Sequence, residues 1–141
     1  MKYFTTFAPE MSNSYFQFKQ FRISQDRCAM KVGTDGTLLG AWAHGGKTIL
    51  DIGTGTGVIA LMMAQRYQEA RVTAIDIDED AVQQARQNAD HSPFGGRVEV
   101  LCETVQQLAQ RTGHQLRYDA IVCNPPFFVD SLKAPDAQRS L

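Results

Sequence analysis

Apolar and polar positions follow a regular rhythm from residue 47 onward. Short apolar runs, typical of buried strands, recur at 48–51, 71–76, 98–102 and 118–123. Segments of helical length with an apolar face lie between them, at 58–66, 78–89 and 104–111. Strands that alternate with helices through short connections predict a parallel sheet covered by helices. Right-handed crossovers make this an α/β, Rossmann-like doubly wound fold.

The first 44 residues follow a different pattern. Residues 15–24 alternate apolar and polar positions with a phase break between Phe18 and Phe21, which predicts a short hairpin or two brief strands. The aromatic side chains there either pack on a core or stack on bases. Thr34 or Asp35 is the expected N-cap of a helix through 38–43, which Gly45 and Gly46 end.

Composition excludes several classes of protein. The 141 residues, of which 43% are hydrophobic and 21% charged, fit one globular domain and neither a disordered nor a fibrous chain. The net charge of -1 differs from that of a strongly basic nucleic-acid binder, although residues 1–50 carry six basic against three acidic side chains. These extra basic side chains either contact phosphates or reflect ordinary variation in charge along the chain. Apolar stretches fall short of the roughly 18 residues that span a bilayer, so we expect no membrane association.

The three cysteines are odd in number and far apart. They form no Cys-x-x-Cys motif, and together with three histidines they show no zinc-ligand spacing, so we expect no metal. Cys102 and Cys123 lie inside apolar runs and are expected to be reduced core residues, which favours the cytoplasm.

A glycine loop with a preceding acid follows the first predicted strand. It reads Asp51-Ile-Gly53-Thr-Gly55-Thr-Gly57, and ligands of such sheets bind outside the carboxyl ends of the strands. Glycines let the backbone approach a ligand closely. Val58 stands where the dinucleotide fingerprint has its last glycine, and an acid would repel a pyrophosphate but suits a cationic amino group. The loop therefore predicts a nucleotide-type ligand that carries an amino group.

Acidic residues also end the second and third predicted strands. Asp76 lies about 20 residues beyond the loop, where a carboxylate binds ribose hydroxyls. Alternatively, Asp76 is only part of the polar cluster 76–80, whose later members cap the next helix. Glu103 or Thr104 is placed to reach an adenine edge, unless Thr104 only caps its helix.

Asn124-Pro125-Pro126-Phe127 follows the fourth predicted strand. Prolines fix the backbone, so the Asn124 side-chain oxygen and the Pro125 carbonyl are two acceptors in a set relation. Two acceptors hold both hydrogens of a planar amino group, make its nitrogen more pyramidal and direct its lone pair at an electrophile. Phe127 and Phe128 offer a face on which a flat heterocycle stacks.

This ordered set of motifs resembles the class I S-adenosylmethionine-dependent methyltransferases that act on exocyclic amines. The stretches 16–21, 26–36 and 38–43 make the chain similar to the bacterial valine-tRNA adenine-N6 methyltransferases, which modify the adenine at position 37 of a tRNA. The resemblance implies S-adenosylmethionine as cofactor and tRNA as partner. It assigns the methionine end of the cofactor to Asp51, Gly53, Gly55 and Gly57, the ribose to Asp76, and the adenine to Glu103 with Thr104. Asn124, Pro125, Pro126 and Phe127 would hold the target base, and the segment from Lys31 to Thr34 would help close the cofactor site.

The resemblance also implies a longer fold than this sequence contains. Family members continue for several more strands, whereas the sequence stops at Leu141, soon after the Asn-Pro-Pro-Phe motif. We therefore expect the N-terminal half of such a domain, with an extension and cofactor-closing segment at 1–44 and a partial cofactor-binding domain at 45–141. Its fourth strand would be an exposed edge, and the chain would bind cofactor weakly and be a poor catalyst.

Three other functions compete with this interpretation. Asn-Pro-Pro-aromatic motifs also occur in methyltransferases of ribosomal RNA guanines and of a protein glutamine. A non-catalytic module would bind the cofactor without transferring a methyl group. A nicotinamide dehydrogenase is disfavoured by Val58 and by the Asn-Pro-Pro-Phe motif.

Overall fold

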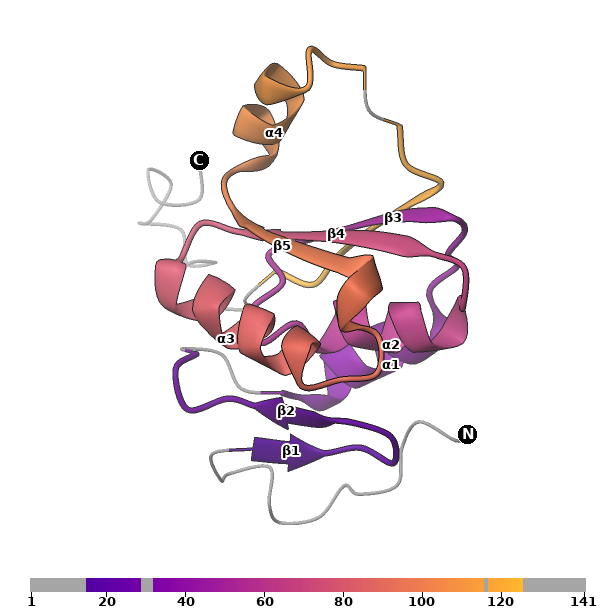
Figure 1. The fold of residues 1–141 in the computed structure, drawn as a ribbon, viewed down its shortest axis with the longest axis vertical. Helices are drawn as coiled ribbons and strands as arrows, with labels where there is room; N and C mark the ends of the chain where they lie inside the picture. Colours follow the sequence, from indigo (N-terminus) through magenta and orange to yellow (C-terminus); the bar gives the residue numbers. More distant parts are fainter. Residues whose placement is uncertain (1–14, 29–31, 116, 126–141) are drawn as a thin grey trace, which may run out of the picture.

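The computed structural model describes residues 15–28, 32–115 and 117–125, and Figure 1 shows their arrangement. The predicted alternation after residue 47 is confirmed, with bounds that differ by one or two residues. The strands are β1 (Tyr15–Gln17), β2 (Arg22–Ser24), β3 (Thr48–Ile52), β4 (Arg71–Asp76), β5 (Val98–Cys102) and β6 (Ala120–Cys123). The helices are α1 (Thr34–Trp42), α2 (Val58–Arg66), α3 (Glu79–Asp90) and α4 (Val105–Arg111), with a short 3-10 turn at Gly95–Arg97.

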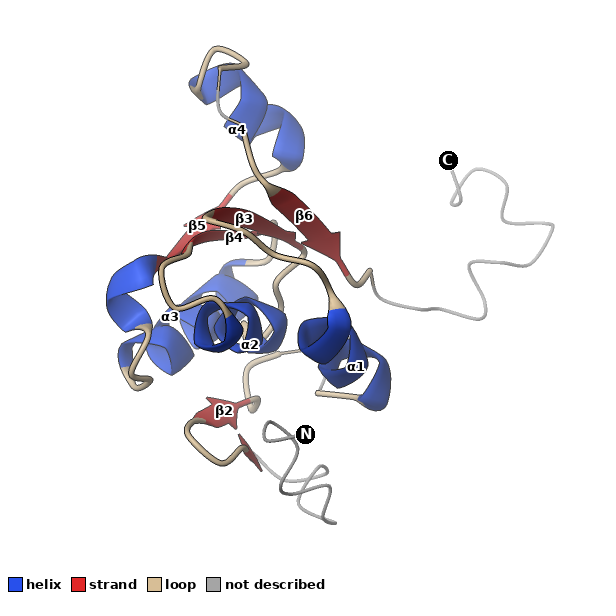
Figure 2. Cartoon of the chain, turned by 90° about the vertical axis from the view of Figure 1, so that its right-hand side faces the viewer, coloured by secondary structure: helices blue, strands red, loops and turns tan. Residues whose placement is uncertain are grey.

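The main sheet has the order β5-β4-β3-β6, and its neighbouring strands are parallel. The chain moves outward from β3 through β4 to β5 and then returns past β3 to form β6. Helices α2 and α3 lie on one face of the sheet with α1, and α4 lies on the other, as Figure 2 shows. This reversal confirms the doubly wound α/β class and places the switch point between β3 and β6.

The larger of two hydrophobic clusters lies between the sheet and α1–α3. Its fully buried members include Ile49, Leu61, Met62 and Met63. A smaller cluster of Leu50, Ile75 and Leu108 lies under α4 on the opposite face. Successive side chains of a strand point to opposite faces, so Ile49 and Leu50 serve different clusters.

The predicted hairpin is confirmed, because β1 pairs antiparallel with β2. Phe16, Phe18 and Phe21 are buried in the larger cluster, and Phe21 meets the ring of Phe94 edge-on at 5.7 Å. The base-stacking alternative is therefore wrong for these three rings, because they have no face open to a ligand. The boundary between 44 and 45 stays a prediction, and the hairpin shares its hydrophobic cluster with the sheet.

The predicted caps of α1 are wrong. The N-cap is Gly33 rather than Thr34 or Asp35, and it has no side-chain cap bond; its extended backbone lets its carbonyl accept from the Thr37 N–H at 3.1 Å. The helix ends at Trp42, where the Arg66 guanidinium donates to the carbonyls of Gly40 and Ala43 at 2.9 and 2.7 Å. The sequence predicted that Gly45 and Gly46 would end this helix. Instead, the Arg66 side chain satisfies the carbonyls at its end.

The burial predicted for two cysteines is also wrong. Cys102 and Cys123 are exposed, whereas Cys28 is buried. All three are free thiols, as predicted for Cys102 and Cys123. Cys102 ends β5 and Cys123 ends β6, which are the two edge strands of this sheet. Edge strands are covered less than central ones, so the apolar neighbours in sequence did not indicate burial here. Within the described ranges, no helix has the length and apolar character to cross a bilayer.

Candidate cofactor and substrate site

A cavity of about 590 Å³ opens at the carboxyl ends of the four parallel strands. The glycine loop after β3, the end of β4, the first residues of α4 and the end of β6 all border it. Of the predicted site residues, the structure brings together Gly53, Gly55, Asp76, Glu103, Thr104, Asn124 and Pro125. Motifs separated by up to seventy residues of sequence therefore share one site.

The glycine loop has left-handed backbone geometry at its three predicted glycines. The φ angles of Gly53, Gly55 and Gly57 are +70°, +57° and +88°, which L-residues rarely adopt. A Cβ on Gly53 or Gly55 would meet nothing within 4 Å, so the loop presents bare backbone to the cavity. Gly57 does not border the cavity: it is the N-cap of α2, where a Cβ would lie 3.2 Å from that of Ala85 and hinder the packing of α2 on α3.

Asp76 borders the cavity and also holds the glycine loop. One carboxylate oxygen accepts from the Gly55 N–H at 2.8 Å, and the other accepts from the Asp78 N–H at 3.0 Å. Asp78 accepts from the Asp80 N–H as the N-cap of α3, so the predicted cap is confirmed. A carboxylate oxygen accepts more than one hydrogen bond, which leaves Asp76 able to bind ribose as well.

Asp51 lies beneath the loop and does not border the cavity. Its side chain is 1% exposed, and Oδ2 accepts from the Thr54 hydroxyl at 2.8 Å. Burial raises the pKa of Asp51 to about 7; hydrogen bonding with Thr54 and with the backbone of Ala60 opposes the rise, and the charge of Asp76 adds to it. Within the described residues, Oδ1 has no hydrogen-bond partner. A cationic group near this oxygen would offset the cost of its burial.

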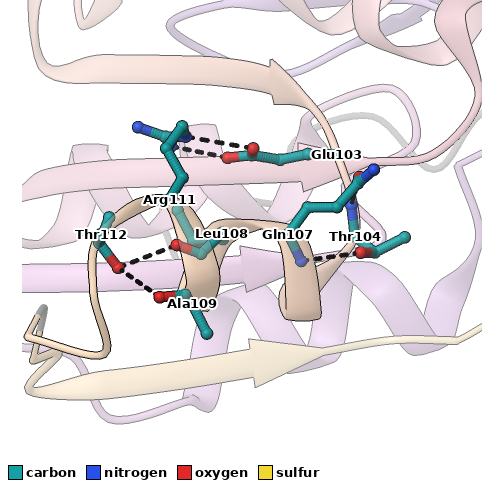
Figure 3. Close-up of polar contacts among 7 residues, drawn as sticks. All are labelled: Glu103, Thr104, Gln107, Leu108, Ala109, Arg111 and Thr112. Carbon is teal, nitrogen blue, oxygen red and sulfur yellow. Dashed lines mark hydrogen bonds and ion pairs between the residues drawn. The ribbon is translucent and has the colours of Figure 1, made fainter.

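Glu103 and Thr104 both border the cavity but already have partners, as Figure 3 shows. The Arg111 guanidinium donates to both carboxylate oxygens of Glu103 at 3.2 and 2.7 Å. Thr104 accepts from the Gln107 N–H and caps α4 in a reciprocal capping box. Thr104 therefore caps α4, while its contact with adenine stays a prediction. The two hydrogen bonds from Arg111 orient the Glu103 carboxylate at the cavity.

Two exposed large apolar side chains at the cavity were not predicted. Ile77 is 74% exposed and Val105 is 38% exposed, and both border the cavity beside the strand ends of β4 and β5. Exposed large apolar side chains at a concave site provide contact area for a flat ligand. The signal for Ile77 was available in the sequence, where an isoleucine interrupts the acidic run 76–80. Thr54, which bonds Asp51 and also borders the cavity, was likewise missed.

The remaining predicted residues are placed only in part. Lys31, Pro126 and Phe127 lie outside the described residues, and Thr34 is placed as the first residue of α1. Their neighbours Cys28, Val32 and Gly33 border the cavity, so the extension forms one of its walls. In the part of the chain that is described, His, Cys, Asp and Glu form no group of three or more that could hold a metal.

Comparison with curated proteins finds close relatives. The chain is 55% identical over 132 residues to the tRNA1(Val) (adenine(37)-N6)-methyltransferase of Bacteroides fragilis, covering 92% of this chain and 55% of the relative. It is 57% identical over 133 residues to the protein of that name from Phocaeicola vulgatus, covering 93% and 55%. The chain therefore spans about half the length of these relatives.

Solved structures share the fold. A SAM-dependent methyltransferase from Agrobacterium tumefaciens superposes with a TM-score of 0.59 at 19% identity, covering 79% of this chain and 39% of that one. TrmK from M. capricolum, solved with S-adenosyl-homocysteine, gives a TM-score of 0.57 at 15% identity, covering 67% and 41%. The family model described as the methyltransferase small domain matches residues 35–141. This chain belongs to the methyltransferase small domain family.

Proposed function

We propose that this cavity binds S-adenosylmethionine and that the protein methylates the exocyclic N6 amine of adenine 37 in a valine tRNA. Relatives that carry this activity in their names include two that are 55% and 57% identical to the chain, which spans about half of their length. The observation that carries the proposal is the shared cavity, where the bare backbone of Gly53 and Gly55 and the Asn124-Pro125 pair border the same space.

The lining residues fit each part of the cofactor. The apolar side chains of Ile77 and Val105 suit the faces of its adenine, with Glu103 at the rim for the base edge. Asp76 would accept from the ribose hydroxyls. The open loop admits the methionine end without a Cβ clash, and the buried, unpartnered oxygen of Asp51 suits the charge of its amino group.

Asn124 and Pro125 would hold the methyl acceptor. The Asn124 side-chain oxygen and the Pro125 carbonyl each accept one hydrogen of the target amine, which turns the nitrogen lone pair toward the methyl group. The bound cofactor supplies that methyl group on a positively charged sulfur. Catalysis is then positioning, with the reacting atoms about 3–3.5 Å apart. A general base is unnecessary, because the methylated ammonium is strongly acidic and loses its proton to water.

Methyl transfer in vitro tests this function. Purified chain is incubated with valine tRNA and methyl-labelled cofactor, and the tRNA is digested to nucleosides for mass spectrometry. We expect label in N6-methyladenosine that accumulates slowly, because the chain covers about half the length of its relatives and is expected to be a poor catalyst. Asn124→Ala should lower the rate at least about 100-fold, because the amine loses one of its two acceptors, while the cofactor Kd measured by calorimetry stays within twofold. Ile121→Ala, an exposed residue outside the cavity, is the matched control.

Three outcomes contradict the proposal in different ways. Label in a ribosomal RNA guanine or a protein glutamine would keep the site but change the substrate. Cofactor binding without transfer to any of these would favour the non-catalytic module, for which Asn124→Ala has no effect on function. Absence of cofactor binding would refute the assignment of the cavity. The proposal includes a cytoplasmic location, which a tRNA substrate and three free cysteines support.

A further inference from the structure

The first turn of α1 packs against the side chain of Asn124. Gly36 lies in that turn and is buried, and a Cβ built on it would lie 3.3 Å from Asn124 Nδ2. Among the described residues, and leaving out Asp35, Thr37 and the backbone of α1, Nδ2 is the one heavy atom that this Cβ would meet within 4 Å. Gly36 and Asn124 both border the cavity, so the contact lies at the site where the acceptor amine would be held.

The geometry of the helix does not itself require glycine at this position. The φ of Gly36 lies outside the left-handed range, and glycine inside a helix costs about 1 kcal/mol relative to alanine. Gly40, one turn later, has a different reason, because a Cβ there would lie 2.6 Å from the sulfur of Met62 in the core. At Gly36 the neighbour is a polar side chain of the proposed active site.

We propose that Gly36 is a positioning residue for Asn124. Its missing side chain lets the nitrogen end of the Asn124 carboxamide lie against α1, and the oxygen end then points away from this helix, toward the acceptor amine. A methyl group at 3.3 Å is closer than the favourable carbon contact of about 3.5–4.0 Å, so it displaces the amide by a few tenths of an ångström. Catalytic groups have to be held within about 0.5 Å of the productive geometry, so a shift of this size uses most of the margin that Asn124 has. This inference rests on the proposed function of Asn124.

The test compares Gly36→Ala with Gly96→Ala in the full chain. Gly96 is exposed, lies in the turn Gly95–Arg97, and a Cβ there meets nothing within 4 Å. The side-chain amide signals of Asn124 are observed by ¹⁵N NMR and assigned by their loss in Asn124→Ala. We expect Gly36→Ala to shift these signals, to leave the melting temperature unchanged or raised, and to lower kcat for methyl transfer at least tenfold with the cofactor KM within twofold. Gly96→Ala should change none of these.

Unshifted Asn124 signals in Gly36→Ala would overturn the proposal, as would shifted signals with an unchanged kcat. Should the wild-type chain transfer no methyl group, the proposed function fails, and the amide signals still decide whether Gly36 sets the position of Asn124. Should Gly36→Ala unfold the chain, the double variant with Asn124→Ala decides. If the added methyl group clashes with the Asn124 amide, the double variant folds. A double variant that stays unfolded refutes this contact.

Discussion

Ile77 and Ile121 are both large apolar side chains in contact with solvent, with exposed fractions of 74% and 60%. Only Ile77 borders the cavity. We predict that Ile77→Ala weakens S-adenosylmethionine binding about 5- to 30-fold, because it removes about 1–2 kcal/mol of apolar contact with the adenine. Calorimetric titration measures the Kd, and Ile121→Ala is the control. Equal affinities of the two variants would refute the adenine subsite at Ile77.

The buried carboxyl of Asp51 makes stability depend on pH. Its pKa is about 7 in the folded protein against about 3.8 ordinarily, so the folded state binds the proton more tightly than the unfolded state. Stability is therefore lost as pH rises from about 4 to 7, by up to about 4 kcal/mol. In Asp51→Asn this loss is absent. Urea unfolding of both proteins at pH 5 and pH 8 isolates the effect, since other titrating groups cancel.

The expected sign is specific. The free energy of unfolding of Asp51→Asn minus that of the wild type should be larger at pH 8 than at pH 5. A stability difference that is the same at both pH values would show that Asp51 ionises normally. A saturating cationic ligand should reduce the difference, because a positive charge near Asp51 favours its ionised form.

Single residues were predictable where their chemistry follows from position at a strand end. Asp76 and Asn124 both border the cavity, as expected from parallel strands. The pair of Glu103 with Arg111 was not predictable, because residues eight apart are not neighbours on a helix and Glu103 precedes α4. The burial of Asp51 depends on packing from α2 and the loop, which periodicity does not report.

At the scale of elements, buried amide side chains connect the hairpin to the glycine loop. Asn88 of α3 accepts from the Ser24 N–H at 2.8 Å and donates to the carbonyls of Ser24 and Thr56 at 2.9 and 2.8 Å. On the same helix Gln84 accepts from the Arg27 N–H at 2.7 Å. One side chain thus links β2, α3 and the glycine loop.

We predict that Asn88→Ala lowers the free energy of unfolding by about 2–4 kcal/mol, since it leaves buried backbone groups unpaired. Cofactor affinity should fall as well, because the Thr56 carbonyl is in the glycine loop that we propose binds the cofactor. Urea unfolding and calorimetry measure the two effects. Gln83→Ala, an exposed neighbour on α3 that contacts Arg27, should change both by little. An Asn88→Ala protein that resembles the control would contradict this role.

The strands and helices after residue 47 were predictable because their apolar runs and faces are uninterrupted and glycines or caps mark their ends. The ends of α1 were not predictable. The sequence indicated Thr34 or Asp35 as the N-cap, but the N-cap is Gly33. It indicated that two glycines end the helix, but Arg66 satisfies the carbonyls there. Side-chain caps compete with long-range partners, and only the three-dimensional structure shows which partner is near.

At the scale of the whole molecule, the hairpin and the parallel sheet share one hydrophobic cluster. We predict that they unfold together. The Phe18 N–H, bonded to Phe21 in the hairpin, and the Leu61 N–H, bonded to Gly57 in α2, should exchange with solvent at the same opening free energy. Native-state hydrogen exchange measures both. A hairpin that opens at a clearly lower free energy would instead support the predicted division at residue 44.

The fold class and the edge of the sheet that carries the site were predictable, but the order of the strands was not. Alternating strands and helices indicated a parallel sheet, and the rule for carboxyl ends indicated where the motifs converge. Periodicity does not give strand order, so the position of β6 beside β3 came from the structure. That position brings Asn124 to α1 and Gly36, a contact between segments that no local pattern connects.

A crystal structure of this chain with S-adenosylhomocysteine tests the central claim most directly. The account predicts that the adenine lies between Ile77 and Val105, that Asp76 accepts from the ribose hydroxyls, and that the sulfur faces Asn124 across the cavity. A ligand bound outside the cavity, or bound there with its sulfur turned away from Asn124, would contradict it.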